Sequence, residues 1–477
     1  MSFARWYNRN LNRIWTFVED RTGMKKWALR PQPEFTFKPS YWTGAFVATA
    51  FLYQVVSGAL LLLYYEPSVN PTLTACGQAV GTLSVSPAAW CSTYYIINSV
   101  PMGSLLLSSH LYGAYAMIFL MLVHFYRGYY MGAYKKPREF SWMVGTLLML
   151  ATLGMGFTGY LLPYTALSYG ATDVGIVLAV RTPYLGNLIA PFLLGNGTPQ
   201  SLLSRMFTAH VLLIPVALGA LLYAHIALFE SHGIAPPASS DPSQRRRFTE
   251  KEDKKHVPFM PHIFFYMTKW ALLYIGVLIG IAALWPWSLP TYYGNTAAVQ
   301  PVIVPDWYFL WLFKMLDFVN GSTPMPAPDA MAIGAVIAVF ILFLPFLDRS
   351  PRTHPRDRPF FIFIGTSLLE FFILLSVWGG MEPSIQIQLF TYTNGLVPII
   401  WRLGPIFVVN ALAIGLFHRR YMRSYRQRLE RRIPSYPGVY APLGSDREGT
   451  AGRRSTPAVA AAPSMGSPSS PGVGYGK

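Results

Sequence analysis

Residues 105–131 read LLLSSHLYGAYAMIFLMLVHFYRGYYM, and residues 206–230 read MFTAHVLLIPVALGALLYAHIALFE. Each stretch is long and apolar enough to cross a membrane as a single helix. Each stretch also carries two histidines, which are His110 and His124 in the first and His210 and His225 in the second. A metal-binding or ionisable side chain is costly at membrane depth, so these four histidines are expected to be functional.

The spacing of the histidines places both members of each stretch on one helix face. The two intervals are 14 and 15 residues, and both are close to four turns of an α-helix. A rise of about 1.5 Å per residue separates the two levels by roughly 21–22 Å. The second and fourth spans run in the same direction, so His110 is expected to face His210, and His124 to face His225.

Two facing histidines at each level match the axial ligands of a haem held between two helices. With both axial positions filled, the iron has no open site for a substrate, and electron transfer is the expected role. Hydrogen-bonded packing is the alternative for a single histidine, but two pairs in register are hard to obtain by accident. Zinc is disfavoured for lack of neighbouring ligands that would complete a tetrahedral site.

Four glycines repeat the register of the histidines at intervals of 14 residues, and they are Gly44, Gly58, Gly145 and Gly159. Glycines at these two levels would let haem edges approach the backbones of the first and third spans. Ordinary packing of helices through small residues is the alternative for each glycine taken alone.

The composition of the chain indicates a membrane protein with many spans. Of its 477 residues, 52% are hydrophobic and 12% are charged, whereas soluble domains average about 25% charged residues. The sequence predicts an all-α polytopic protein with a four-helix di-haem bundle followed by a C-terminal four-helix part. Eight transmembrane helices are expected, at about 41–65, 105–131, 141–162, 206–230, 263–288, 331–347, 359–379 and 397–418.

The net charge of +17 is concentrated on one side of this expected topology. Lys and Arg cluster within 1–30, 135–138, 245–255, 349–358 and 419–432, whereas 66–104 and 380–396 contain neither. This is the positive-inside pattern with an even number of spans. It predicts a multi-pass protein of a prokaryotic plasma membrane with both termini cytoplasmic, and a nucleic-acid partner is not expected.

The chain divides into five expected regions. A basic amphipathic segment on the membrane surface is followed by the di-haem bundle, a cytoplasmic linker, the C-terminal four-helix part and a disordered tail rich in Ser, Pro, Gly and Ala. In order, these regions are residues 1–35, 36–232, 233–262, 263–432 and 433–477.

The two cysteines of the chain, Cys76 and Cys91, both fall in the first outer loop of this topology. An oxidising compartment permits a disulfide there, so we predict a Cys76–Cys91 bridge, with two unpaired thiols as the alternative. No C-x-x-C-H motif occurs, so covalent attachment of a c-type haem is not indicated.

Several motifs resemble the cytochrome b family, the membrane core of quinol-oxidising cytochrome bc and bf complexes. They are HFYRGYYMGAYKKPRE at 124–139, GYLLP at 159–163, PDWY at 305–308 and FLDRSP at 346–351. The resemblance covers roughly residues 30–430. It implies that the four histidines ligate two non-covalent b-type haems, a low-potential outer haem on His110 and His210 and a high-potential inner haem on His124 and His225. We call these residues the outer pair and the inner pair.

The resemblance also implies a quinol site near the outer pair. Asp306 stands in place of the glutamate in the family's Pro-Glu-Trp-Tyr motif, and Trp307, Tyr308 and Tyr160 are expected to line the pocket. Quinol oxidation releases two protons, so a carboxylate is a plausible acceptor, although Asp306 could instead cap a helix or lie on the surface. Towards the inner side, the candidates for binding a haem propionate or a quinone are Arg127, Glu230 and His232.

Some positions depart from the family pattern. The 15-residue step from His210 to His225 resembles the photosynthetic branch, yet the chain is not split after the fourth span as in that branch. Trp42 replaces the cysteine that binds an extra haem in that branch, and Leu107 replaces an arginine common before the first ligand. Phe313 stands where respiratory members often have tyrosine.

The function expected from the resemblance is a quinol:electron-acceptor oxidoreductase subunit in a respiratory complex. Its implied partners are a Rieske iron–sulfur protein, further respiratory-complex or oxidase subunits, quinone, membrane lipid and a second copy of the complex. The alternative is a haem-bearing subunit of a terminal quinol oxidase supercomplex, in which an a-type haem could replace haem b. A transporter would need charged residues at the membrane midplane, and a small di-haem anchor would lack the last four spans.

Overall fold

The structure is a computed structural model of the 477-residue chain. It describes residues 13, 16–17, 19–23, 29, 31–33, 36–72, 76, 86–180, 186–238, 256–295, 304–319, 328–381 and 396–432. The chain forms two compact units, and the first, Met1–Tyr421, contains all of the spans discussed below. The second unit, Met422–Lys477, begins within the last helix.

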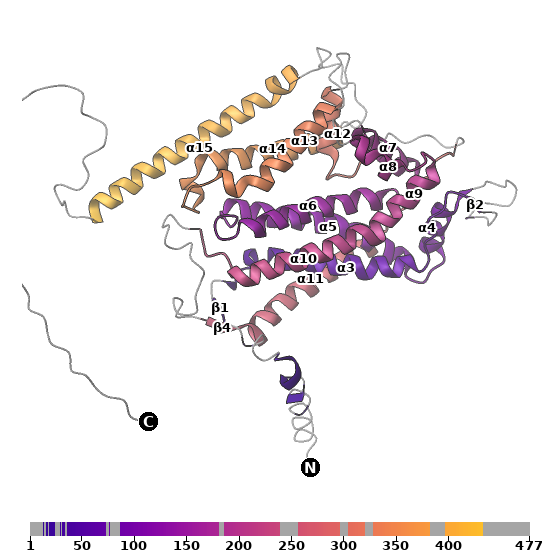
Figure 1. The fold of residues 1–477 in the computed structure, drawn as a ribbon, viewed down its shortest axis with the longest axis horizontal. Coiled ribbons are helices and arrows are strands. Elements are labelled where there is room, and N and C mark those ends of the chain that lie inside the picture. Colours follow the sequence, from indigo (N-terminus) through magenta and orange to yellow (C-terminus); the bar gives the residue numbers. More distant parts are fainter. Residues whose placement is uncertain are drawn as a thin grey trace, which may run out of the picture. The chain divides into compact units, whose positions relative to one another are not determined.

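Helices dominate the part of the chain that the structure describes (Figure 1). The helices are α3 (Thr43–Leu62), α4 (Ala88–Asn98), α5 (Gly103–Tyr130), α6 (Glu139–Tyr160), α7 (Ala166–Val180), α8 (Gly186–Leu194), α9 (Pro199–Thr208), α10 (Ile214–His232), α11 (Phe264–Leu284), α12 (Leu310–Val319), α13 (Pro328–Leu347), α14 (Pro359–Met381) and α15 (Leu396–Arg432). Short 3-10 turns lie at Pro39–Tyr41 and Pro355–Asp357, and π-helical turns lie at Ala209–Leu213 and Phe259–Ile263.

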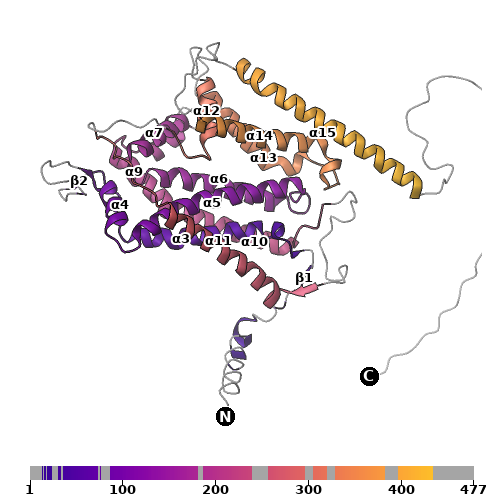
Figure 2. The same cartoon turned by 180° about the vertical axis from the view of Figure 1, so that it is seen from behind.

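Four long helices form the bundle that carries the histidines. Helix α3 packs along α5, and α10 packs along α6. Figures 1 and 2 show these four helices side by side from opposite directions, with α11 next to α3 and α5. On the other flank, α13 packs against α6, and α12 packs against α13 and α14. The predicted di-haem bundle therefore corresponds to a contiguous group of helices.

The lengths and composition of the helices indicate a multi-pass membrane protein. Six helical stretches among the described residues are long and apolar enough to cross a membrane: Thr43–Leu62, Gly103–Tyr130, Glu139–Tyr160, Pro199–His232, Phe259–Leu284 and Pro359–Met381. The other two expected spans coincide with α13, whose apolar stretch Gly334–Leu347 is shorter, and with α15. Helix α15 also continues to Arg432, beyond the expected end of its span at residue 418.

A π-helical turn explains how a 15-residue step keeps two histidines in register. At about 100° per residue, 15 residues rotate roughly 60° beyond four turns. The turn Ala209–Leu213 contains His210, and the Ile214 N–H donates to the carbonyl of Ala209, five residues back. A π-turn takes one extra residue, so His225 returns towards the face of His210. Pro215 follows directly and lacks the N–H that an α-helix would need at this point.

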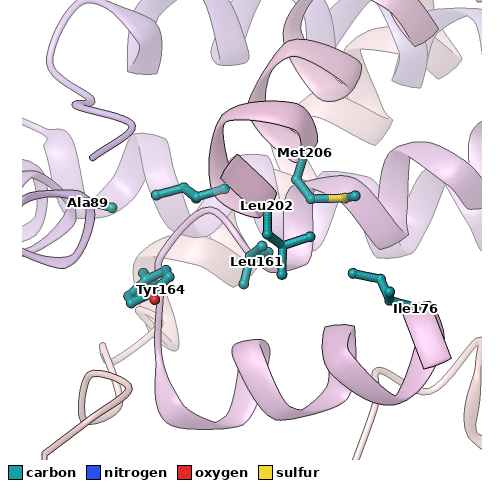
Figure 3. Close-up of a cluster of buried hydrophobic side chains, with 7 residues drawn as sticks. Ala89, Leu161, Tyr164, Ile176, Leu202 and Met206 are labelled. Atoms are coloured by element: carbon teal, nitrogen blue, oxygen red, sulfur yellow. The ribbon is translucent and has the colours of Figure 1, made fainter. Parts of the chain in front are cut away.

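A buried apolar cluster closes one end of the bundle (Figure 3). It brings together side chains from the start of α4, the end of α6, the following turn, α7 and α9. Its members are Ala89, Leu161, Tyr164, Ile176, Leu202, Leu203 and Met206. The Tyr65 hydroxyl reaches this region from the end of α3 and donates to the carbonyl of Leu162 at 2.7 Å. The short helices α4, α7 and α9 thus form a cap, which was not predicted from the sequence.

Two short antiparallel ribbons add a small amount of strand to the predicted all-α fold. Strand β1 (Pro31–Pro33) pairs with β4 (His256–Pro258), and β2 (Pro71–Thr72) pairs with β3 (Ser86–Pro87). The first ribbon joins the segment before α3 to the segment before α11. Because α11 also packs on α3 and α5, the fifth span belongs with the first half of the molecule as much as with the second.

A buried ionic cluster connects the segment after α5 to the segment after α13, at the end of the bundle opposite the apolar cap. The carboxylate of Asp348, after α13, accepts from Lys135 at 2.7 Å, from Arg358 at 3.2 Å and from the Tyr134 hydroxyl at 2.5 Å. The side chains of Asp348 and Arg358 are fully buried, and that of Lys135 is 3% exposed. Arg358 also donates to the carbonyl of Tyr130 at the end of α5. One carboxylate therefore holds two cations that come from segments more than 200 residues apart.

Removal of this carboxylate should destabilise the fold strongly. Asp348→Ala would leave two buried cations without their counter-ion, a change that typically costs about 3–5 kcal/mol. Arg352→Ala is the matched control, because Arg352 is 46% exposed and its bridge to Asp357 is 3.9 Å long, so the expected loss is below about 1 kcal/mol. Thermal unfolding of the two detergent-purified variants tests this, and equal midpoints would show that the cluster is not structural.

Candidate functional site

The structure brings the predicted histidines together in the predicted pairs. The ring centroids of His110, on α5, and His210, in the π-turn before α10, lie 6.5 Å apart with the rings nearly perpendicular. His225 lies close enough to His124 to act on it electrostatically, as does Arg127 one turn further along α5. The two pairs therefore lie at two levels between the same helices, α5 and α10.

Each histidine also meets the glycine that shares its register. A Cβ built on Gly44 would lie 3.0 Å from Cε1 of His124, and one on Gly145 would lie 3.1 Å from Cε1 of His225. The corresponding distances are 3.2 Å from Gly58 to His110 and 2.5 Å from Gly159 to His210. By contrast, a Cβ on Gly219, on α10, would meet nothing within 4 Å. The four glycines are therefore placed against the imidazole rings themselves.

Hydroxyl side chains that the sequence argument missed hold three of the four rings. Ser57 Oγ lies 2.8 Å from Nδ1 of His110, and Thr43 Oγ1 lies 2.9 Å from Nδ1 of His124. Thr158 Oγ1 lies 3.3 Å from Nδ1 of His210. Each hydroxyl residue directly precedes one of the glycines, as Ser-Gly or Thr-Gly. This hydroxyl–glycine dipeptide could have indicated the contacts from the sequence, because it occurs at three of the four glycines.

The residues fit a haem at each level. Two imidazoles face one another, and glycines leave room beside each ring for a flat macrocycle. Near the inner pair, the guanidinium of Arg127 lies 4.5 Å from the ring centre of Tyr41, and its buried Nε has no hydrogen-bond partner among the described residues. An unpartnered buried cationic donor is costly, and a propionate would satisfy it. The ligand and propionate roles themselves remain predictions.

The predicted quinol-site residues lie against the flank of α6 near the outer pair. Asp306 accepts from the Tyr115 hydroxyl through Oδ1 at 2.7 Å and from the Tyr308 hydroxyl through Oδ2 at 3.1 Å. Both carboxylate oxygens are thus engaged by tyrosines, whereas an N-cap would accept from helix N–H groups. Tyr115, on α5, was not expected in this group, because its link to Asp306 spans 191 residues.

The other members of this group close the space around Asp306. Tyr308 is 3% exposed, and its ring lies against Gly156 of α6, where a Cβ would come 2.8 Å from the hydroxyl. The Tyr160 hydroxyl donates to the carbonyl of Val304 at 3.4 Å, and the Trp307 ring packs edge-on against Tyr308. Gly156 and Gly159 lie on the same helix, so α6 holds Tyr308 within one turn of the glycine that meets His210.

Burial changes the acid–base behaviour of Asp306. Desolvation raises the pKa of this carboxyl above its ordinary value, because the charged form loses its hydration. The hydrogen bonds from Tyr115 and Tyr308 act in the opposite sense and partly restore the charged form. The result is a carboxyl that binds a proton more readily than one in water while two hydroxyls keep its anion accessible.

The remaining candidates lie at the edges of the bundle. Glu230 is exposed near the end of α10, and Nδ1 of His232 bonds the carbonyl of Leu228 on its own helix at 2.8 Å. The carbonyl of His232 accepts from Arg138 at 3.2 Å. Their proposed contact with an inner quinone stays a prediction. In the first loop, a disulfide joins Cys76 to Cys91 of α4, with their Cα atoms 5.4 Å apart.

Two family models match consecutive parts of this chain. Residues 115–291 match the model described as Cytochrome b(N-terminal)/b6/petB, and residues 293–397 match the model described as Cytochrome b(C-terminal)/b6/petD. The boundary falls after α11, in agreement with the packing of that helix against α3 and α5. The first match thus includes α6, α10, α11 and most of α5, with His124, His210 and His225, but it begins after His110 and leaves out α3.

Curated relatives extend the match over most of the chain. A cytochrome b of Sulfolobus acidocaldarius is 36% identical over 426 residues, which are 84% of this chain and 70% of that protein. A cytochrome b of Cereibacter sphaeroides is 29% identical over 77% of this chain and 84% of its own length. A menaquinol:cytochrome c reductase cytochrome b subunit of Bacillus subtilis is 35% identical over 240 residues, 48% of this chain and 99% of that protein.

A solved structure shares the fold. A chain of a hyperthermophilic respiratory Complex III superposes with a TM-score of 0.63 at 24% identity, and the match covers 84% of this chain and 96% of that one. The family models and the curated relatives show that the chain belongs to the cytochrome b family of bc-type complexes. The family predicted from the sequence motifs is confirmed, and membership implies b-type haems.

The hydrogen bond from Tyr115 should set the proton affinity of Asp306. Tyr115→Phe removes a donor that stabilises the carboxylate, so the pKa of Asp306 is expected to rise further. Infrared titration of the carboxyl C=O band measures this, with Asp306→Asn to assign the band. Tyr112→Phe is the control on the same helix, since the Tyr112 hydroxyl donates to the Trp285 carbonyl. An unmoved band in Tyr115→Phe would contradict the assignment.

Proposed function

We propose that this cytochrome b oxidises quinol on the outer side of a prokaryotic plasma membrane and passes electrons inward through two bis-histidine haems. The observation that carries the proposal is the position of the Asp306 group beside the outer pair. Helix α6 packs Tyr308 at Gly156 and His210 at Gly159, so a proton acceptor and an electron acceptor would lie within about one helical turn of each other.

The chemistry of this group suits the loss of a proton from quinol. A quinol hydroxyl must transfer its proton to a base as its electron leaves. Asp306 is a carboxylate whose raised pKa makes it a better proton acceptor than an exposed aspartate. Tyr115 and Tyr308 stabilise its anion and hold its orientation through their hydroxyls. A bis-histidine haem would supply one-electron transfer without binding a substrate at iron.

The charge pattern and the helices support the proposed topology. We propose eight spans, with α13 and α15 as the sixth and eighth and with both termini cytoplasmic. The ionic cluster at Asp348 would then lie on the basic cytoplasmic side, and the apolar cap with its disulfide would lie on the outer side. The five regions predicted from the sequence, with boundaries after 35, 232, 262 and 432, remain our proposal for the domain organisation.

The partners follow from membership in a bc-type complex. We propose a Rieske iron–sulfur protein as the acceptor of the other electron of quinol, and a dimer of complexes in the membrane. The name of the Bacillus subtilis relative specifies menaquinol. For this chain we propose quinol as the substrate class and do not specify the ring system of the quinol.

Loss of one inner ligand should remove one haem. In His225→Leu, His124 keeps no facing imidazole, so the inner haem should be lost while the outer haem assembles. A pyridine haemochrome assay of the purified complex should fall from two haems per chain to one, and its spectrum also identifies b-type or a-type haem. His232→Leu, on the same helix, should retain two. Two low-spin haems in His225→Leu would refute the ligand assignment.

Loss of the carboxylate should slow quinol oxidation without changing haem content. Removal of a general base typically costs on the order of 100-fold or more, so Asp306→Asn should lower turnover by about that factor. In the unmodified protein the rate should rise as pH increases through the pKa of Asp306, because only the deprotonated carboxyl accepts a proton, and the variant should lose this rise. Asp173→Asn, on α7 and exposed, is the control. Unaltered turnover in Asp306→Asn would reduce Asp306 to a structural residue.

A further inference from the structure

The two levels of the bundle differ in what their histidines bond through Nδ1. A ligating imidazole binds iron through one nitrogen, and the group bonded to its other N–H sets its orientation and basicity. Three rings meet a hydroxyl from the residue before their glycine, as described above. The fourth glycine, Gly145, follows Val144, and Nδ1 of His225 has no hydrogen-bond partner among the described residues. The outer pair is therefore better supplied with acceptors than the inner pair.

At His110 the direction of the hydrogen bond can be assigned from the network. The Ser57 hydroxyl lies 2.7 Å from the carbonyl of Tyr53, four residues back on α3, and donates its only proton there. Towards Nδ1 of His110, at 2.8 Å, the same oxygen can then only accept. His110 must carry its proton on Nδ1, which leaves the lone pair on Nε2. Ser57 is 3% exposed, so water does not compete for this contact.

At His210 the same assignment holds, with a second acceptor. The Thr158 hydroxyl donates to the carbonyl of Gly154 at 2.9 Å and accepts from Nδ1 of His210 at 3.3 Å. The carbonyl of Met155 lies 3.1 Å from the same Nδ1, and a carbonyl can only accept. Both rings of the outer pair are thus held as the tautomer that exposes Nε2, with three acceptors between them.

The inner pair has less support. Thr43 Oγ1 lies 2.9 Å from Nδ1 of His124, but Thr43 stands at the first turn of α3, and among the described residues no backbone carbonyl accepts its proton. Around His225, the carbonyl of Ser141 acts on the ring as a backbone acceptor, but the contact is too poorly aligned or too long to meet full hydrogen-bond geometry. Ser141 precedes Gly145 by four residues, as Met155 precedes Gly159, so the two rings are held in corresponding places with unequal contacts.

We propose that Ser57 and Thr158 are positioning residues that lower the reduction potential of the outer haem, and that the weaker acceptor contact at His225 keeps the inner haem at a higher potential. This inference rests on the ligand assignment in the proposed function. An acceptor on Nδ1–H makes the imidazole a stronger electron donor to iron and favours the ferric state. The unequal acceptors would therefore favour electron movement from the outer level to the inner level.

Redox titration of both haems in the purified complex tests the proposal. In Ser57→Ala the only hydroxyl acceptor of His110 is lost, and the potential of the outer haem should rise while that of the inner haem stays unchanged. A tenfold shift of the oxidation equilibrium, which is about 59 mV for one electron, is the expected scale. Thr158→Ala should produce a smaller rise, since Met155 still accepts from His210. Ser57→Thr keeps the hydroxyl and should restore the original potential.

A converse variant adds an acceptor at the inner level. In Val144→Ser a hydroxyl stands directly before Gly145, as Ser57 stands before Gly58, and it should lower the potential of the inner haem alone. This variant removes only a methyl group's worth of packing from the surface of α6, so it keeps the proposal testable if Ser57→Ala fails to assemble. Val144→Ala is its control, since it removes one more heavy atom than Val144→Ser and adds no hydroxyl, and it should leave the potential in place.

The outcomes separate this inference from the proposed function. Fewer than two low-spin bis-histidine haems in the unmodified complex would overturn the ligand assignment, and the inference with it. Two haems whose potentials remain unchanged in Ser57→Ala and in Val144→Ser would overturn the inference and leave the ligand assignment intact. A rise at the outer haem in Ser57→Ala, with a fall at the inner haem in Val144→Ser, is the result expected.

Discussion

The close approach of four imidazole rings to four glycines constrains the rest of the bundle. A ring can lie at about 3 Å from the place of a Cβ only where that Cβ is missing, so α3 must present glycines to α5, and α6 must present them to α10. The residue before the glycine then faces Nδ1, which explains why hydroxyls recur there at Thr43, Ser57 and Thr158. These contacts fix the rotation and axial position of each helix pair. The 15-residue step from His210 to His225 is one residue longer than the other steps, and the π-turn at His210 accommodates the extra residue.

Much of this site could be predicted from sequence because its information is periodic. Intervals of 14 and 15 residues report helix faces directly, and glycines in the same register report where neighbouring backbones approach. The hydroxyls could not be predicted in the same way, since Ser57 reaches His110 across 53 residues and that contact depends on the rotation of α3 against α5. The π-turn was also missed, because Pro215 disfavours regular α-helix there without specifying whether the chain kinks or widens.

The fold beyond the bundle was harder to predict for two physical reasons. Helices α4, α7 and α9 are each too short to span a membrane, so a search for long apolar runs does not detect the apolar cap that they build. The buried ionic cluster could not be recognised because its residues are part of the charge pattern that indicates the cytoplasmic side. Lys135, Arg358 and Asp348 lie among the basic loop residues that indicate the cytoplasmic side, and nothing in the sequence separates the buried cations from the exposed ones. Only tertiary packing shows that these three share one dry cluster.

That cluster and the Asp306 group connect α5 and the segment after it to the C-terminal half at two separate places. Near the middle of α5, Tyr115 donates to the segment before α12, and beyond the end of α5, Tyr134 and Lys135 bond the segment after α13. Both contacts join the histidine-bearing helix to the C-terminal half without using the linker 233–262. The Bacillus subtilis relative matches 48% of this chain along 99% of its own length. In this chain, polar contacts from the middle of α5 and from the segment after its end therefore join the two halves, in addition to the apolar packing between them.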